Sequence, residues 1–166
     1  MNAATKFRIE PATEKDVSVI LSLIEGLAEY EKLSHEVVAT EKSLRESLFG
    51  ARRVAEVVIG YAGKEPVGFA VFFHNYSTFL GRPGIYLEDL FVLPQWRRRG
   101  LGTQLLRYIA HQAVARNCGR LEWSVLDWNE PAIGFYKKLG ARAMDEWTVY
   151  RVTGDALKKL ASVEAT

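Results

Sequence analysis

A glycine-containing turn constrains the fold of this chain more than any other segment. The turn reads Arg97-Arg98-Arg99-Gly100-Leu101-Gly102-Thr103. An apolar run from Ile85 to Leu93 precedes it, and Pro94 ends that run because proline cannot continue an interior strand ladder. Apolar residues then recur three and four positions apart from Gly100 to Asn117, which is typical of an amphipathic helix. The sequence therefore predicts a strand, a glycine turn and a helix in direct succession.

Such a turn suits an anion. The first turn of a helix exposes unpaired backbone N–H groups, and glycine lets a diphosphate approach the backbone closely. A dinucleotide fingerprint would need a third glycine where Leu105 stands, and no phosphate-binding P-loop is present. Two plainer interpretations are a solvated arginine cluster and a nucleic-acid patch. Three adjacent arginines form no extended basic face, so the nucleic-acid interpretation has little support.

The remaining elements alternate between strands and helices. Strands are expected at 7–9, 54–61, 67–74, 121–126 and 147–152, and helices from Thr13, from Thr40 to Gly50 and from Pro131 to Leu139. The strands at 54–61 and 67–74 read as an antiparallel hairpin, and residues 75–84 read as a loop before the central strand 85–93. The sum is a mixed α/β fold, and residues 1–166 are expected to form one domain because no linker or repeat interrupts them.

Composition excludes several classes of protein. The 166 residues are 48% hydrophobic and carry a net charge of +2, which predicts neither nucleic-acid nor membrane attraction. Cys118 is the only cysteine, so an intramolecular disulfide framework and a cysteine-rich zinc site are excluded. No apolar run approaches the ~20 residues of a membrane span, and 1–6 lacks the layout of a signal peptide. We expect a cytoplasmic protein.

Arg97, Gly100 and Gly102 match the [Gln/Arg]-x-x-Gly-x-[Gly/Ala] signature of the GNAT acyl-CoA N-acyltransferases. Further runs resemble the diamine (spermidine/spermine) N-acetyltransferase subfamily between Phe7 and Val152. These runs are Tyr86-Leu87-Glu88-Asp89-Leu90-Phe91-Val92, Trp128-Asn129-Glu130-Pro131-Ala132, Phe135-Tyr136-Lys137-Lys138-Leu139-Gly140 and Leu27-Ala28-Glu29-Tyr30-Glu31. The resemblance implies a GNAT fold, which is a central mixed and mostly antiparallel sheet flanked by helices.

The resemblance also implies acetyl-CoA as cosubstrate and direct transfer within a ternary complex. The implied cofactor contacts are Phe91, Val92, Leu93, Arg97, Arg98, Arg99, Gly100, Leu101, Gly102, Thr103, Asn129 and Tyr136. The backbone of the first three would pair with the pantetheine arm as an added strand would. Asn129 is also placed to cap the helix that follows it, and the two roles are compatible.

Amine acetylation needs a base, because an amine of pKa ~10.4 is almost entirely protonated at pH 7. Glu88 is the predicted proton acceptor, since an acid in an apolar strand is poorly suited to packing. Strand alternation places Asp89 on the opposite face unless a bulge intervenes. The alternative is a buried carboxylate satisfied by backbone or arginine.

A phenol can protonate the departing CoA thiolate. Spacing alone makes Tyr136 a core tyrosine, and the resemblance makes it this acid. An acyl-cysteine at Cys118 has little support, because no histidine lies near it in sequence. The three histidines lack metal-ligand spacing, so no metal is expected.

The resemblance places Tyr30, Glu31, Glu88, Glu122, Trp123 and Ser124 at the amine substrate. Many of the nearby acids can equally be solvated surface charges. The region of Asp145 and Glu146 is shorter than the family pattern, which favours a short acceptor such as thialysine over a long polyamine.

The predicted function is acetyl-CoA-dependent N-acetylation of a small diamine, polyamine or lysine-like amine. The alternatives are a protein or peptide N-acetyltransferase and a non-catalytic acyl-CoA-binding module. Dimers are common in the family, so a homodimer is compatible with the resemblance, and neither a nucleic acid nor a membrane is expected as a partner.

Overall fold

The structure is a computed structural model that describes residues 6–162, so most of the segment 1–6 discussed above lies outside it. The chain divides into two compact units, residues 1–124 and residues 125–166. The single domain predicted from the sequence stays a prediction.

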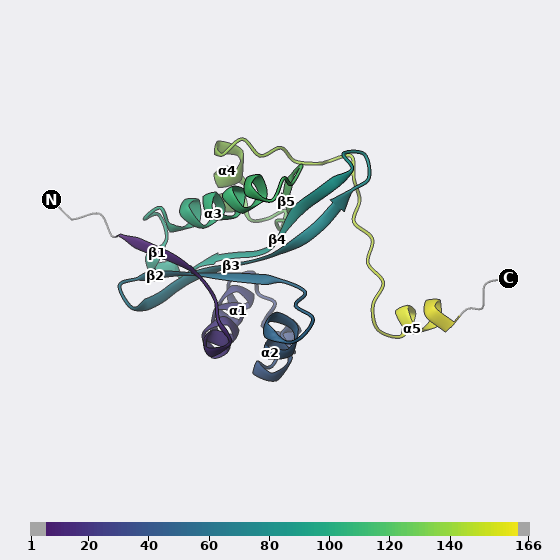
Figure 1. Ribbon diagram of the computed structural model, residues 1–166, viewed down its shortest axis with the longest axis horizontal. Helices are drawn as coiled ribbons and strands as arrows, with labels where there is room; N and C mark the ends of the chain where they lie inside the picture. The colour runs from purple at the N-terminus through teal and green to yellow at the C-terminus, as the bar shows by residue number, and fades with distance from the viewer. Residues whose placement is uncertain (1–5, 163–166) are drawn as a thin grey trace. The chain divides into compact units, whose positions relative to one another are not determined.

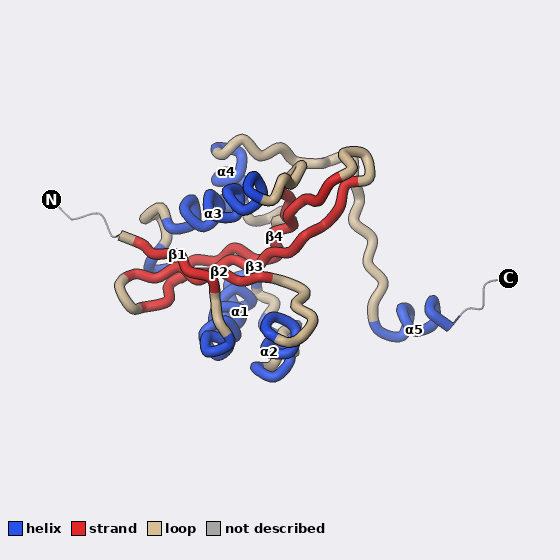
Figure 2. Tube along the Cα trace, in the orientation of Figure 1, coloured by secondary structure: helices blue, strands red, loops and turns tan. Residues whose placement is uncertain are grey.

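The first unit is built on one five-stranded sheet in the order β1-β2-β3-β4-β5 (Figures 1 and 2). The strands are β1 Phe7–Pro11, β2 Glu56–Ala62, β3 Glu65–Ser77, β4 Arg82–Val92 and β5 Leu121–Trp123. Neighbours pair antiparallel except β4 and β5, which are parallel. The predicted mixed, mostly antiparallel sheet is therefore confirmed.

Helices cover both faces of this sheet. The helices α1 (Val17–Glu31) and α2 (Glu41–Phe49) lie on one face, and α3 (Leu101–Ala115) lies on the other (Figure 1). Predicted caps begin two of these elements: Asp16 accepts from the Thr13 backbone N–H at 2.7 Å, and Thr40 Oγ1 accepts from the Ser43 N–H at 3.2 Å. The first cap precedes a short 3-10 turn, Glu14–Asp16, that leads into α1.

The core on the α1 face joins buried side chains of α1 and α2 to three strands. Its buried members are Ile20, Leu23, Leu48, Val57, Ile59, Phe69, Val71 and Phe91. Because strand side chains alternate, the strand residues between these core members face α3. On that side Phe72 of β3 and Leu87 of β4 are almost completely buried, as is Leu105 of α3. Each face of the sheet is thus fixed by its own set of apolar side chains.

Three details of the first unit correct the sequence predictions. Strand pairing continues to Ser77 and resumes at Arg82, so the loop expected at 75–84 shrinks to 78–81. The middle strand is β3, and β4 is the fourth of five. Val114 is 80% exposed, which makes the buried stripe of α3 narrower than its apolar spacing suggested.

The second unit holds α4 (Glu130–Lys138), as predicted, and α5 (Gly154–Ser162), which the sequence analysis missed. The strand predicted at 147–152 is wrong: this segment is irregular, and Trp147 and Tyr150 are 73% and 91% exposed. A strand needs a paired neighbour, and among the described residues this segment has none. The expected strand 121–126 likewise ends at Trp123. No helix in the described range is long and apolar enough to span a bilayer.

Candidate active site

A β-bulge in β4 brings two consecutive carboxylates to the same region. Val71 pairs with Asp89 while the next residue, Phe72, pairs with Leu87, so Glu88 is the extra residue. Asp89 then lies on the α1 face with Val71 and Phe91, and Glu88 is exposed at the bulge. The exposure of Glu88 argues against the alternative of a buried carboxylate at this residue, and its role as proton acceptor stays a prediction.

Asp89 is the buried carboxyl of the pair. Burial raises its pKa to about 6 from an ordinary 3.8, and the neighbouring charges of Glu88 and Glu31 add to the increase. Burial also raises the pKa of Glu31, at the C-terminal end of α1. Three carboxyl groups therefore share one small region, where a cation offsets their mutual repulsion.

The edge of β4 opens next to these carboxylates. β5 pairs only with Ile85–Leu87, so β4 continues without a strand on that side. The Leu93 N–H donates to the Val67 carbonyl at 2.9 Å, and the Leu93 carbonyl accepts from the Trp96 N–H at 2.8 Å. Backbone groups alternate sides along an antiparallel strand, so those of Val92 and Leu90 face the open edge. Leu93 thus uses both backbone groups within the chain, and the Val92 carbonyl accepts from Arg97 Nε. The pantetheine contacts at Phe91, Val92 and Leu93 stay predictions.

The glycine turn leads from this edge into α3. Gly100 is the N-cap of α3 with φ 91°, and Arg98 has φ 61°, so the turn contains two left-handed residues. The Gln104 N–H donates to the Gly100 carbonyl at 3.1 Å. The N–H groups of Leu101, Gly102 and Thr103 precede this first helical bond and are the donors an anion would meet.

The three arginines of the turn have different surroundings. Arg97 Nε donates to the Val92 carbonyl at 3.0 Å, and its guanidinium lies 4.1 Å from the centre of the Tyr30 ring. Arg99 lies over Trp96 at 4.8 Å and is exposed, as is Arg98. Arg97 therefore fastens the end of α1 to the end of β4, whereas the other two arginines face solvent.

Two of the substrate residues predicted at 122–124, Glu122 and Ser124, make polar contacts with neighbouring side chains. Glu122 Oε2 lies 2.8 Å from Arg120 Nε and accepts a 2.8 Å hydrogen bond from Asn75 Nδ2. Ser124 Oγ and the Tyr86 hydroxyl are 2.7 Å apart. Trp123 is half-buried. Glu122 is thus held in place by groups that the sequence analysis did not identify.

In the second unit, Asn129 performs the capping role predicted for it. Its Oδ1 accepts from the Ala132 N–H at 3.3 Å at the start of α4, and the residue is buried. Tyr136 is half-buried on α4, with its ring 5.2 Å from that of Phe135. The roles of Asn129 and Tyr136 at acetyl-CoA stay predictions.

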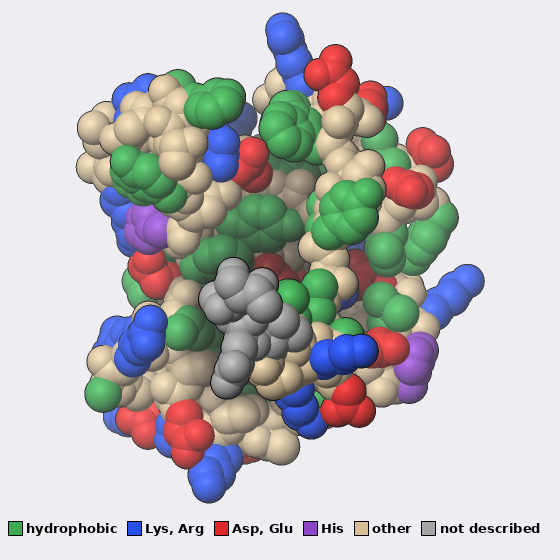
Figure 3. All heavy atoms as spheres, turned by 90° about the vertical axis from the view of Figure 1, so that its right-hand side faces the viewer, with side chains coloured by type: hydrophobic (Ala, Val, Ile, Leu, Met, Phe, Trp, Pro, Cys, Tyr) green, Lys and Arg blue, Asp and Glu red, His purple; other side chains and the backbone are tan. Residues whose placement is uncertain are grey.

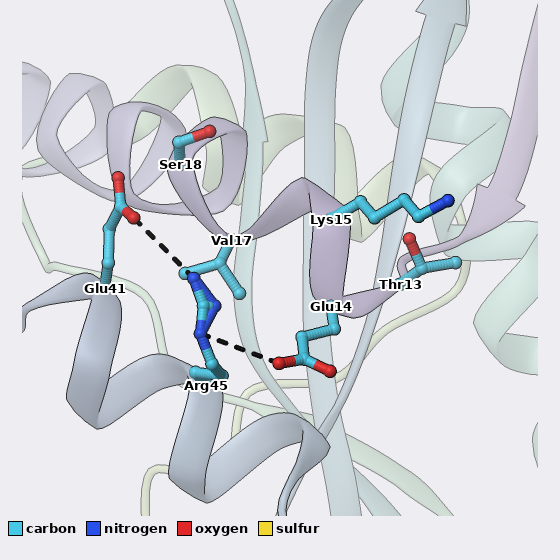
Figure 4. A pocket seen from close by; sticks show the side chains of 7 residues that line it. All are labelled: Thr13, Glu14, Lys15, Val17, Ser18, Glu41 and Arg45. Atoms are coloured by element: carbon cyan, nitrogen blue, oxygen red, sulfur yellow. Dashed lines mark ion pairs between the residues drawn. The ribbon is translucent and has the colours of Figure 1, made fainter.

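Other surface features are less suited to binding or catalysis. A shallow hollow between the starts of α1 and α2 is lined by seven residues, among them Thr13, Lys15 and Ser18 (Figure 4). There Arg45 is neutralised by Glu14 at 3.6 Å and Glu41 at 3.8 Å. On the face seen in Figure 3, basic and acidic side chains are interspersed, and neither sign forms a continuous patch.

The first unit therefore brings together most of the predicted residues. Tyr30 and Glu31 of α1, the two carboxylates of the bulge, and the glycine turn all meet at the open end of β4. The bulge at Glu88 is the exception under which the sequence did not place Asp89 opposite Glu88, and nothing in the residue pattern marks its position. Arg120 and Asn75 carry no local signal at all, since their role depends on strand register.

Comparison with known proteins agrees with this geometry. The acetyltransferase (GNAT) family model matches residues 24–141. A thialysine N-epsilon-acetyltransferase of Mus musculus is 39% identical over 165 residues, covering 93% of this chain and 96% of the relative. An L-ornithine N5-acetyltransferase of Arabidopsis thaliana is 34% identical over 198 residues, covering 92% of this chain and 87% of the relative.

A solved structure from the mobile metagenome of V. cholerae, an integron cassette protein, superposes with a TM-score of 0.80. It is 27% identical and covers 95% of this chain and 98% of its own. The fold, the signature turn and these relatives lead to one conclusion: the chain belongs to the GNAT acetyltransferase family and is an N-acetyltransferase.

Proposed function

We propose that this enzyme transfers the acetyl group of acetyl-CoA to the terminal amine of a small lysine- or ornithine-like acceptor. The observation that carries the proposal is the buried carboxyl of Asp89 beside Glu88 and Glu31, at the open edge of β4. Such a region attracts an ammonium group and offers a base for its proton.

The turn before α3 fits the diphosphate of acetyl-CoA. Its first three N–H groups precede the helical ladder, and the exposed side chains of Arg98 and Arg99 supply positive charge beside them. The open edge of β4 supports pairing of the pantetheine arm with the backbone of Val92. Acetyl-CoA supplies the thioester, which is the activated acyl group.

Transfer requires three proton movements. The acceptor ammonium first gives a proton to the carboxylate pair Glu88 and Asp89, directly or through water, and the free amine attacks the thioester carbonyl. The carbon–sulfur bond then breaks, and the departing thiolate takes a proton from the Tyr136 hydroxyl. The acetylated nitrogen loses its second proton, which returns to the Tyr136 oxygen directly or through water. Acetylated amine and CoA are the products.

The surroundings of the carboxylates support a cationic acceptor. Glu31 at the end of α1 has a raised pKa through burial and adds a third carboxyl to the pair. An ammonium ion among these carboxylates gains charge-assisted hydrogen bonds.

Two relatives support the choice of acceptor, since their names specify thialysine and ornithine. Both acceptors are short amino acids with a terminal amine. The short region at Asp145 and Glu146 is consistent with that size. A cytoplasmic location and a homodimer are further proposals that the residues of the site do not depend on.

A thiol-release assay tests this function. The purified enzyme is given acetyl-CoA and, separately, thialysine, ornithine, lysine, putrescine, spermidine, spermine and a lysine-containing peptide. We expect turnover with the short acceptors and little with spermine or peptide. Turnover with peptide alone would establish a protein acetyltransferase instead, and acetyl-CoA binding without any transfer would establish a binding module.

A further inference from the structure

Arg120, which directly precedes β5, and Glu122 of β5 form an ion pair, and each has unused hydrogen-bonding groups. Their side chains are 38% and 37% exposed. Both charge-assisted contacts of Glu122 fall on Oε2, from Arg120 and Asn75, and among the described residues no hydrogen bond reaches Oε1. Arg120 uses Nε for Glu122 and Nη2 for a 3.4 Å contact to the Tyr76 carbonyl. Within that range, Nη1 donates to no protein group.

These two side chains share a sheet face with the carboxylates of the bulge. Tyr86 is in register with Glu122, and Asp89 lies on the same face as Val71 across from it. The contacts with Asn75 and Tyr86 identify the side of β5 on which Glu122 and Ser124 lie as the α1 face, and Arg120 reaches Glu122 from just before the strand. A ligand can therefore extend along this one face of the sheet, from Arg120 and Glu122 to the carboxylates of the bulge.

The spacing suits a short amino acid. At ~3.3 Å per residue, the three-residue step from Tyr86 to Asp89 spans at most about 10 Å. The α-carbon and terminal nitrogen of an extended lysine-sized chain are about 6 Å apart. An extended lysine-sized chain is therefore shorter than this step, and hydrogen bonds of about 2.8 Å join its ends to the two groups.

We infer that Arg120 and Glu122 bind the amino-acid head group of the acceptor, with Arg120 holding the α-carboxylate and Glu122 the α-ammonium. A guanidinium recognises a carboxylate through paired N–H donors, and Glu122 Oε1 is open to an ammonium donor. Asn75 positions Glu122 by holding its other oxygen. The terminal amine then lies towards Glu88 and Asp89. This inference rests on the proposed function and narrows its acceptors to α-amino acids.

Matched acceptor pairs test the inference. Each amino acid is compared with the diamine that lacks its carboxylate: ornithine with putrescine, and lysine with cadaverine. The wild-type enzyme is expected to prefer the amino acid in kcat/KM. Arg120→Met is expected to lower that preference about tenfold or more, through the KM of the amino acid, with kcat and the diamine constants little changed. Arg120→Lys is expected to restore part of the preference.

Glu122→Gln is expected to weaken both members of each pair, because ammonium is the group they share. Arg82→Met is the matched control: it removes the same charge from the neighbouring strand, where Arg82 contacts Asn117 at 3.3 Å, and should leave the preference unchanged. Thermal unfolding midpoints show whether each variant is folded.

The outcomes are distinguishable. A parallel loss for amino acids and diamines in Arg120→Met, or an unchanged preference, overturns the inference. A wild-type enzyme that acetylates only diamines also overturns it but leaves acetyl transfer to a small amine intact. If no acceptor is acetylated, the proposed function fails, and calorimetric binding of ornithine to the CoA-bound wild type and Arg120→Met decides the inference separately. Equal binding by the two proteins overturns it.

Discussion

Asp89 is the residue at which the structure adds most to the prediction from the sequence. The sequence favours its neighbour Glu88 as the proton acceptor, because an acid is unusual in an apolar strand. The bulge instead exposes Glu88 and turns the side chain of Asp89 towards the α1 face, where it is half-buried. A bulge depends on how β4 pairs with β3, and that pairing is a tertiary property. The sequence therefore predicts an acidic pair here but not which member is buried.

The raised pKa of Asp89 predicts the pH dependence of catalysis. The proton acceptor must be ionised, so kcat/KM for the acceptor should rise as the pH increases through about 6. Asp89→Asn should remove this limb and lower kcat/KM by about 10² or more, a typical loss for a general base. Steady-state rates between pH 5 and 8 check both expectations. An Asp89→Asn profile identical to wild type would exclude Asp89.

The same group predicts a stability effect of opposite sign. Its folded-state pKa of about 6 exceeds the ordinary 3.8, so the folded protein binds more protons and loses stability as pH rises between these values. Asp89→Asn, which cannot ionise, should therefore stabilise the protein at pH 7.5 by up to about 3 kcal/mol. Urea unfolding at pH 7.5 and pH 4 measures this. The gain should be smaller at pH 4, and a destabilised variant at pH 7.5 would contradict the burial argument.

At the scale of elements, the turn before α3 is the part the sequence predicts best. Its strand, glycines and helix are local in sequence, and Gly100 caps α3 as expected, with φ 91°. The short β5 and the irregular segment 147–152 depend instead on neighbours far along the chain. Strand propensity at Trp147 and Val149 is present, but a strand forms only where another strand pairs with it.

Two glycine substitutions separate the structural role of the turn from its binding role. Gly100→Ala and Gly63→Ala both place a side chain at positive φ, 91° and 61°, and each should cost about 1 to 2 kcal/mol of stability. Gly63 lies in the β2–β3 turn, away from the start of α3. Only Gly100→Ala is expected to weaken acetyl-CoA binding, by about tenfold, because it disturbs the N–H groups at the helix start. Calorimetry measures the affinity, and equal affinities in the two variants would remove the turn from the cofactor site.

At the scale of the whole molecule, the general acid proposed for the reaction, Tyr136, lies in the second unit, residues 125–166. The sequence assigns Tyr136 its role through family resemblance alone, because its spacing on α4 is equally that of a packed tyrosine.

Tyr136→Phe tests this assignment. Removing one hydroxyl deprives the thiolate of its acid, so kcat should fall about 10² or more while the Kd for acetyl-CoA changes by less than about threefold. Tyr150→Phe is the control, since Tyr150 is 91% exposed in the same unit and should leave kcat unchanged. Equal rates for Tyr136→Phe and wild type would exclude Tyr136 as the acid.

The near-neutral charge of the whole chain is compatible with opposite charges at two separate places. Arg98 and Arg99 stand at the cofactor turn, while Glu31, Glu88 and Asp89 stand at the acceptor end, so opposite charges gather locally within a net +2. The separation of charges becomes visible only when the strands are paired.

The position of the acetyl group in the product tests the central claim most directly. Ornithine is turned over with acetyl-CoA labelled with ¹³C in the acetyl group, and the product is examined by NMR. The account predicts acetylation of the terminal nitrogen, because the head group is held on β5 and the terminal amine lies at Asp89 and Glu88. Acetylation of the α-nitrogen, or no acetylated product, would contradict it.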